Sequence, residues 1–194
     1  FRKLDILKDK NLIFENLDIT DSKSIYKIIK KYKFNEIYNL AAKSSPRLSF
    51  KFPISTSEVN AIAVLKILET IRKYSPSSKF YQASTAGIFG QPLISPQTED
   101  TPLKPTNPYA TSKAYAHNLI ENYRDSYGLF ACSGIMYSLE SPLRSNEFVT
   151  KKIINNLVLI KKNKKILFEL GNLNAVRDFG YVDDFVRAMW LMLQ

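Results

Sequence analysis

Short apolar segments alternate along this chain with longer segments whose apolar residues recur at the spacing of a helix. The strand-like segments cover residues 36–42, 79–84 and 130–137, and the helix-like segments cover residues 24–33, 58–74, 109–127, 148–162 and 182–193. Parallel strands need long crossover connections, most often helical, which then cover both faces of the sheet. The alternation therefore predicts an α/β fold built on a doubly wound parallel sheet, with helices on both faces.

The glycines do not form the turn with which a dinucleotide-binding sheet normally begins. That turn follows the first strand, is rich in glycine and leads into a helix. The six glycines here are dispersed, at Gly87, Gly90, Gly128, Gly134, Gly171 and Gly180. The chain also stops within an apolar, helix-like segment. We therefore expect a sheet that is incomplete at its N-terminus, in a chain that is the middle of a longer protein.

Composition narrows the class of protein. With 194 residues and 45% hydrophobic residues, the chain suits one domain with a sizeable core. It contains no run of about 18 or more apolar residues, so we expect no membrane partner. The single cysteine, Cys132, cannot form an internal disulfide, and a cytoplasmic location is the default expectation.

The net charge of +10 raises the question of a nucleic-acid partner. Lysines gather at Lys27, Lys30, Lys31 and Lys33, but no aromatic RNA-binding motif, heptad or zinc-ligand spacing accompanies them. We therefore interpret them as a solvated helix end and expect no nucleic-acid partner. With one histidine and one cysteine in the chain, we also expect no metal site.

Tyr109 and Lys113 are the leading candidates for chemistry. Their four-residue spacing places a phenol and an ammonium on one face of a helix. A neighbouring ammonium favours the phenolate, so we expect Lys113 to lower the pKa of Tyr109 and make it a general base near neutral pH. Thr85 follows the strand-like segment 79–84, where its hydroxyl can hold a substrate oxygen. We predict that the three side chains meet at the end of that strand.

Longer stretches resemble the extended short-chain dehydrogenase/reductases and, within them, the GDP-mannose 4,6-dehydratase family. These stretches are EIYNLAA at 36–42, KFYQAST at 79–85, ESP at 140–142, FVTKKI at 148–153 and residues 171–194. The resemblance implies a Rossmann-like doubly wound parallel sheet with part of a small substrate-binding region. We accordingly divide the chain into an incomplete NAD(P)-binding Rossmann-like domain, residues 1–137, and a nucleotide-sugar-binding segment with a returning Rossmann strand and helix, residues 138–194.

The resemblance also implies a reaction on a GDP-sugar. Bound NADP, with NAD as the alternative, would take a hydride from C4 of GDP-mannose. A glutamate would remove the C5 proton, water would leave from C6 and the hydride would return to C6, giving GDP-4-keto-6-deoxymannose. By position, Tyr109 is the base, Lys113 lowers its pKa and holds the cofactor ribose, and Thr85 orients the sugar hydroxyl. The complete protein is expected to be a homo-oligomer.

Further binding residues are implied by position. On the cofactor side, Asp18 and Ile19 would lie against the adenine, and Asn39, Leu40, Ala41 and Ala42 would line the cofactor channel. On the substrate side, the resemblance implies Ser84, Glu140, Phe148, Val149, Lys152 and Arg177, of which Phe148, Val149 and Lys152 correspond to the guanine end. The Arg177 guanidinium suits diphosphate oxygens, although a surface ion pair with Asp178 or Asp183 is the alternative.

The chain departs from the family pattern at the chemistry itself. Gly87 stands where the family has a glutamate, two positions after the catalytic threonine. Ala86, Ser138 and Leu139 replace the serine, asparagine and histidine of the pattern. Glycine cannot take a proton, so elimination loses its base. Three interpretations stay open: a GDP-mannose 4,6-dehydratase relative, a nucleotide-sugar epimerase or reductase, and a truncated relative without activity.

Overall fold

The computed structural model describes residues 9–146, 148–163 and 167–194, and a parallel sheet lies at its centre. Its strands β1 (Glu36–Asn39), β2 (Lys79–Ala83) and β3 (Ala131–Gly134) lie in that order. Ile37 lies opposite Phe80, and Phe80 lies opposite Ala131. Both strand pairs are parallel, which confirms the architecture predicted from the alternation of strands and helices.

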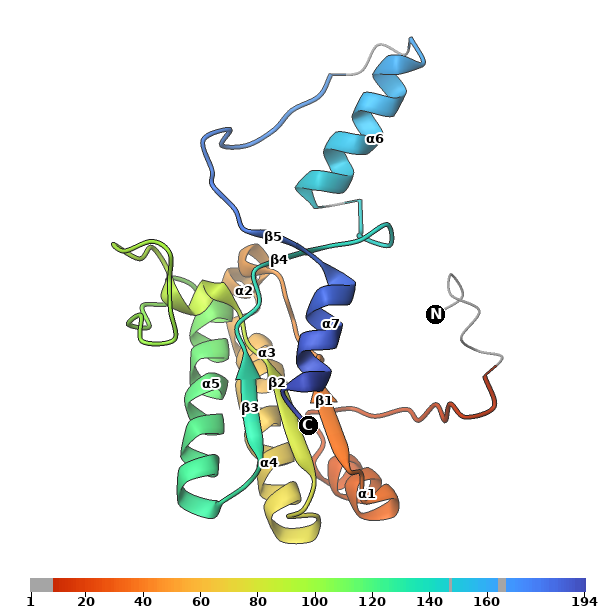
Figure 1. Ribbon diagram of the computed structural model, residues 1–194, viewed down its shortest axis with the longest axis vertical. Helices are drawn as coiled ribbons and strands as arrows, with labels where there is room; N and C mark the ends of the chain where they lie inside the picture. The colour runs from red at the N-terminus through yellow and green to blue at the C-terminus, as the bar shows by residue number, and fades with distance from the viewer. Residues whose placement is uncertain (1–8, 147, 164–166) are drawn as a thin grey trace.

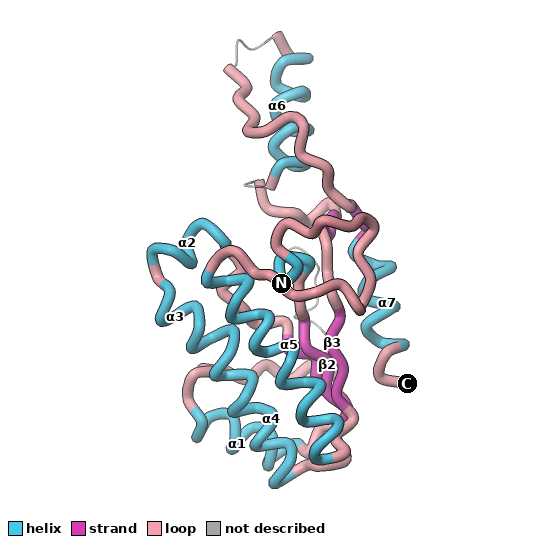
Figure 2. The backbone as a smooth tube through the Cα atoms, turned by 90° about the vertical axis from the view of Figure 1, so that its left-hand side faces the viewer, coloured by secondary structure: helices cyan, strands magenta, loops and turns pink. Residues whose placement is uncertain are grey.

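Three helices cover one face of this sheet: α1 (Ser22–Tyr32), α4 (Ala63–Tyr74) and α5 (Pro108–Tyr127). Figure 2 shows them on one side of the strands. One cluster of buried apolar side chains joins the helices to the sheet, and its largest fully buried members are Ile25, Leu68, Ile71, Phe80 and Ile120. Burying a side chain of this size contributes roughly 1.5–3 kcal/mol relative to leaving it in water, so this cluster is the main core.

The opposite face of the sheet is covered by α7 (Val182–Leu191), as Figure 1 shows. Met189 and Leu193 pack there with Tyr81 and Ala83 of β2. Successive side chains of a strand point to opposite faces, so Phe80 belongs to the first cluster and Tyr81 to this one. The prediction that helices cover both faces is therefore confirmed.

The ends of α5 are fixed by its sequence. The Asn107 side chain accepts a hydrogen bond from the Ala110 N–H at 2.9 Å, and Pro108 follows at the first helical position, where no N–H is needed. At the other end Gly128 adopts a left-handed conformation, φ +66°, which glycine adopts without steric cost. These caps place Tyr109 in the first turn of the helix, at the carboxyl end of the neighbouring strand.

The helical segment before β2 is more broken than predicted. The predicted helix at 58–74 begins with a π-helical turn, η2 (Glu58–Ile62), which continues into α4. Two short helices precede it, α2 (Pro46–Lys51) and α3 (Pro53–Ser57). A proline stands at the start of each, because its ring fits the first turn and breaks a helix that is already running.

The predicted strand at 130–137 is also shorter than expected. Strand β3 ends at Gly134, and the chain enters a second parallel pair, β4 (Ser138–Glu140) with β5 (Phe179–Tyr181). Beyond β4, α6 (Val149–Lys161) projects from the body of the molecule, as Figure 1 shows, and no side chain of this helix is buried. The last part of the chain thus combines a projecting helix with α7, which completes the core.

Gly134 is predicted to be essential for packing β3 against Tyr81. A Cβ at this position would overlap the Tyr81 hydroxyl and ring, and Tyr81 is fully buried between the sheet and α7. We therefore expect Gly134→Ala to lower the free energy of unfolding by about 1–3 kcal/mol, the usual cost of overpacking a core. Urea denaturation measures it. Gly171→Ala is the matched control, because a Cβ there meets nothing within 4 Å. Equal effects of the two substitutions would contradict the packing argument.

Candidate active site

Thr85, Tyr109 and Lys113 meet at the carboxyl end of β2. Thr85 follows this strand and starts the short helix η3 (Ala86–Phe89), where its hydroxyl accepts a hydrogen bond from the Gly87 N–H at 3.2 Å. The Tyr109 phenol shares a side-chain hydrogen bond with Thr85. One turn further along α5, the Lys113 ammonium donates to the Ala83 carbonyl at 2.9 Å. The four-residue spacing thus places both α5 side chains against the same strand end.

Burial controls the protonation of this group. Lys113 is 3% exposed, and burial lowers the pKa of its ammonium to about 8. Burial raises the pKa of Tyr109, and the hydrogen bond with Thr85 opposes that rise. We expected Lys113 to lower the pKa of Tyr109, and in this structure that expectation is wrong. The reason is that desolvation of the phenol is the largest effect, while the Lys113 ammonium is directed at the Ala83 carbonyl.

Gly87 lies at the same corner, two residues after Thr85. A Cβ built on Gly87 would lie 3.5 Å from the Thr85 hydroxyl oxygen and 3.6 Å from the Ala110 Cβ. These are ordinary van der Waals distances, so the backbone leaves room for a side chain to begin there. The corner therefore brings together a hydroxyl, a phenol and an ammonium, without a carboxylate at position 87.

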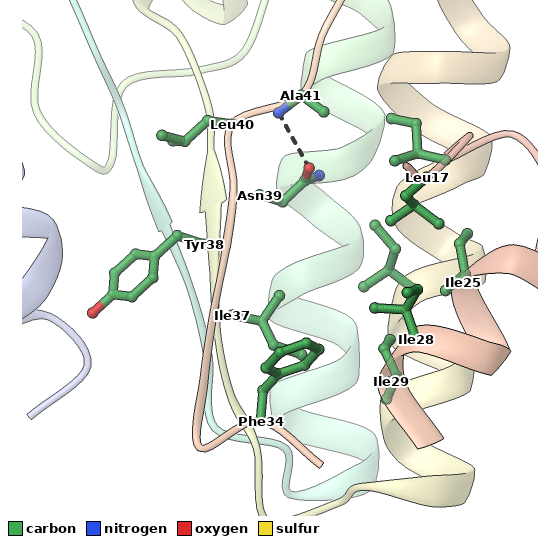
Figure 3. A pocket seen from close by; sticks show the side chains of 12 residues that line it. Leu17, Ile25, Ile28, Ile29, Phe34, Ile37, Tyr38, Asn39, Leu40 and Ala41 are labelled. Atoms are coloured by element: carbon green, nitrogen blue, oxygen red, sulfur yellow. Dashed lines mark hydrogen bonds between the residues drawn. The ribbon is translucent and has the colours of Figure 1, made fainter. Parts of the chain in front are cut away.

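Four of the six residues expected at the adenine and along the cofactor channel line one groove beside β1. Figure 3 shows this groove, of about 350 Å³, which includes Ile19, Asn39, Leu40 and Ala41. The rest of its lining is aliphatic or aromatic, from α1, β1, α4 and the segments on either side of α1. A planar aromatic base fits such an apolar wall. The other two residues, Asp18 and Ala42, are the chain neighbours of Ile19 and Ala41, which line the groove.

The Asp18 carboxylate is already engaged locally. One of its oxygens accepts from both the N–H and the hydroxyl of Thr20, each at 2.8 Å. These hydrogen bonds lower the pKa of Asp18, so the group is an exposed anion at neutral pH. The groove therefore presents a carboxylate at its rim and apolar side chains within.

The residues expected to meet the substrate do not form one cluster. Arg144 joins two of them: its Nε lies 3.7 Å from a Glu140 oxygen, and its guanidinium carbon lies 3.5 Å from the centre of the Phe148 ring. Val149 and Lys152 lie on the projecting helix α6, which Val149 begins. The Lys152 ammonium donates to the Glu169 carbonyl at 2.6 Å.

Arg177 and Ser84 differ in how their polar groups are satisfied. Arg177 is exposed and donates to the carbonyl of its neighbour Val176 at 2.8 Å, and the ion pairs found among the described residues do not include it. Ser84 is 3% exposed, and its hydroxyl has no hydrogen-bond partner among the described residues. Of the substrate-side residues, only Ser84 lies in the chain directly beside Thr85.

Sequence reasoning missed Asn60, which joins the backbone of Lys43 to Ser112 in the first turns of α5. This residue is buried on the π-helical turn η2. Its amide accepts from the Lys43 N–H at 2.9 Å and donates to the Lys43 carbonyl at 3.1 Å and to the Ser112 hydroxyl at 3.2 Å. Ser112 in turn donates to the Tyr109 carbonyl at 2.7 Å. The available signal was an asparagine at an apolar position of the predicted helix 58–74.

The described residues form neither a metal-binding cluster nor a membrane-spanning helix. No group of three or more histidine, cysteine, aspartate or glutamate side chains there could hold a metal ion. No described helix is both long enough and apolar enough to cross a membrane.

Comparison with known proteins agrees with this arrangement. The family described as GDP-mannose 4,6 dehydratase matches residues 2–194. A GDP-mannose 4,6 dehydratase of Drosophila melanogaster is 45% identical over 179 residues, which are 91% of this chain and 45% of the relative. GDP-mannose 4,6 dehydratase 2 of Arabidopsis thaliana is 46% identical over 181 residues, 91% of this chain and 48% of the relative. The chain thus spans about half the length of these curated relatives.

Solved structures share the fold. RMD from Pseudomonas aeruginosa, complexed with NADPH, superimposes with a TM-score of 0.85 at 22% identity, covering 94% of this chain and 64% of that one. A dTDP-glucose 4,6-dehydratase from Bacillus anthracis, in complex with NAD, has a TM-score of 0.81 at 27% identity, covering 95% and 56%. The family match over nearly the whole chain and the curated relatives at 45% and 46% identity establish that the chain belongs to the GDP-mannose 4,6-dehydratase family.

Proposed function

We propose that this chain is the catalytic part of a nicotinamide-dependent enzyme that acts on GDP-mannose, as the family dehydratases do. The observation that carries the proposal is the meeting of Thr85, Tyr109 and Lys113 at the carboxyl end of β2. Ligands of open α/β sheets bind at this edge of the strands. The groove with Ile19 and Asn39 belongs to the neighbouring strand, so cofactor and sugar would lie side by side.

In this proposal the cofactor is NADP, with NAD as the alternative, and it supplies hydride transfer at C4 of the mannose. Support comes from the relatives, of which one solved structure carries NADPH and another carries NAD. The apolar groove would hold the adenine between Ile19 and Ala41, with Asp18 at the rim. Asn39 lies at the end of β1, where it would face the channel.

The protein residues have separate tasks in the first step. Thr85 orients the sugar hydroxyl, and Tyr109 accepts the hydroxyl proton as general base. Burial raises the pKa of Tyr109, so a base at this position needs its phenolate stabilised. The hydrogen bond with Thr85 lowers the pKa and so favours the phenolate. Lys113 is a cation below pH about 8, so it can hold a ribose hydroxyl of the cofactor.

The second step is where this chain differs from a complete dehydratase. Removal of the C5 proton needs a base, and Gly87 provides no side chain at the position of the family glutamate. Glu140 is engaged with Arg144 at 3.7 Å, so it is not a ready substitute. The glycine at position 87 favours a second candidate function, a nucleotide-sugar epimerase or reductase. Such an enzyme needs only the three residues of the first step. A truncated relative without activity is the remaining alternative.

The wider assignments are proposals too. Residues 1–137 would form the incomplete cofactor domain, and residues 138–194 would bind the GDP end of the sugar nucleotide through Phe148, Val149, Lys152 and Arg177. The exposed apolar side chains of α6, such as Ile154 and Leu157, support a homo-oligomer in the complete protein. A single, half-buried cysteine is consistent with a cytoplasmic setting.

Tyr109→Phe tests the proposed chemistry. A longer protein, in which this chain is extended to the length of its curated relatives, is mixed with NADP and GDP-mannose, and the near-ultraviolet absorbance of reduced nicotinamide is followed. The substitution removes only the phenolic oxygen, so we expect the rate to fall by about 10²–10⁴, the usual contribution of a positioned acid–base group. Tyr115→Phe, on the exposed side of the same helix, is the control and should keep the parent rate. An unchanged rate in Tyr109→Phe would remove Tyr109 from the reaction.

Gly87→Glu tests the missing elimination base. In the longer protein we expect the 4-keto-6-deoxy product to form very slowly from GDP-mannose, and to form about 10²–10⁴ times faster after the substitution. The room around Gly87 allows the new side chain to begin without backbone overlap. Gly171→Glu, in an open exposed region, controls for an added charge. Rapid dehydration by the parent protein would show that another residue has taken this role.

Lys113→Met tests whether the site is held at a cost in stability. The folded pKa is about 8 and the ordinary value is 10.5, so the unfolded chain binds more protons between these two values. Stability attributable to this group therefore rises with pH across that window and is lowest below pH 8. We expect Lys113→Met to have a higher free energy of unfolding than the parent at pH 7, by about 1–3 kcal/mol, because each unit of pKa shift corresponds to about 1.4 kcal/mol.

The advantage of Lys113→Met should shrink as the pH approaches 10, in denaturant titrations of the 194-residue chain. Lys27→Met, at an exposed position of α1, is the matched control and should show no such trend. If Lys113→Met were less stable than the parent at every pH, the buried ammonium would be a stabilising group and the argument would fail.

A further inference from the structure

A directional chain of hydrogen bonds runs from the end of β1 to Lys113. The Ala41 N–H donates to the Asn39 side-chain oxygen at 3.3 Å, a contact drawn in Figure 3. The Asn39 amide donates to the Gln82 side-chain oxygen at 2.8 Å, and the Gln82 amide donates to the Ala83 carbonyl at 2.9 Å. Lys113 donates to this same carbonyl, also at 2.9 Å. The chain therefore joins two regions that are far apart in the sequence.

The direction of this chain is fixed at both ends by the backbone. The Ala41 N–H can only donate, so it requires the oxygen of Asn39 and leaves the amide nitrogen for Gln82. The Ala83 carbonyl can only accept, so it requires the amide nitrogen of Gln82 and leaves the oxygen for Asn39. The two requirements agree, so neither amide has an equally good flipped orientation.

Asn39 and Gln82 are placed for this contact by the sheet register. They lie directly opposite each other across the β1–β2 pair. Gln82 also shares its face of β2 with Phe80, which packs in the main core, so both amides point toward the helices. Gln82 is 1% exposed and Asn39 is 7% exposed. Apolar side chains would fill such a core at lower desolvation cost, so a buried amide pair calls for a role beyond filling space.

Gln82 and Lys113 are neighbours because they share one acceptor. Both nitrogens lie 2.9 Å from the Ala83 oxygen, so they are no further apart than twice that distance. A carbonyl oxygen that receives two donors divides its acceptor strength between them. The elements packed around α5 also carry charged and titratable groups: Tyr109, His117, Glu121, Arg124 and Asp125 on α5 itself, Glu58 on η2, Lys66, Glu69, Arg72 and Lys73 on α4, Lys79 and Tyr81 on β2, and Cys132 on β3. Burial alone lowers the pKa of Lys113, so none of the nearby carboxylates offsets the cost of desolvating its ammonium.

We propose that Gln82 is a positioning residue for Lys113, which it holds through the shared Ala83 carbonyl and ties to Asn39 at the end of β1. The importance of this role rests on the proposed function, in which Lys113 and Asn39 contact the cofactor. A ligand that contacts residues 39–41 would then affect the position of the Lys113 ammonium through the side-chain amides of Asn39 and Gln82. The coupling itself is a property of the ligand-free chain and can be measured there.

The test replaces Gln82 and observes Lys113 directly. Lysine side chains of the 194-residue chain are labelled with ¹³C and ¹⁵N, and the Lys113 signal is identified by its loss in Lys113→Met. Gln82→Glu keeps the acceptor for Asn39, loses the donor to Ala83 and places a carboxylate beside the ammonium. We expect it to raise the pKa of Lys113 by about one to three pH units. Gln82→Met leaves the Ala83 carbonyl to Lys113 alone and should produce a smaller rise.

Gln91→Glu is the matched control, because it makes the same chemical change at an exposed position and should leave the Lys113 signal unchanged. If Gln82→Glu does not fold, Gln82→Met decides the question. A folded Gln82→Met whose Lys113 pKa is unchanged or lower, even with reduced stability, would show that Gln82 is only a packing residue and would overturn the proposal. Because neither cofactor nor sugar is present, this outcome is independent of whether the longer protein turns over GDP-mannose.

Discussion

The packing of α5 across β2 and β3 is the contact on which the rest of the structure depends. Ala116, Ile120 and Tyr123 of this helix belong to the same buried cluster as Phe80 and Ala131 of the strands. That apolar contact sets the height of α5 along the sheet. The first turn of α5 therefore lies at the carboxyl end of β2. The position of the candidate active site thus follows from the packing of the later turns of this helix.

Polar groups buried at this strand end are costly, and the structure satisfies most of them in two networks. One consists of Asn60, Ser112 and the backbone of Lys43, and it holds the first turns of α5. The other joins Asn39 and Gln82 to the Ala83 carbonyl. Burying amides costs desolvation even when they are hydrogen-bonded, so the presence of these networks next to Lys113 fits a site in which geometry is maintained at the expense of stability.

The family relationship and the residue at position 87 bear on different aspects of the protein. The family is established by similarity over nearly the whole chain, and it accounts for the sheet and the helices. Gly87 concerns a single step of the proposed reaction, and the backbone there still leaves room for a side chain. A fold can keep its binding geometry while one catalytic group is lost, because packing and proton transfer depend on different side chains.

The sequence by itself determined the order of the main elements, β1 to β3 with α1, α4, α5, α6 and α7, since hydrophobic periodicity and capping residues such as Asn107 and Gly128 act locally. It also identified Thr85, Tyr109 and Lys113 through spacing and family resemblance. Only the tertiary structure decided that burial raises the pKa of Tyr109, that Lys113 is bound to the Ala83 carbonyl, and that Asn39 meets Gln82. These features depend on desolvation and on contacts between segments distant in the chain, and no local pattern of residues encodes either.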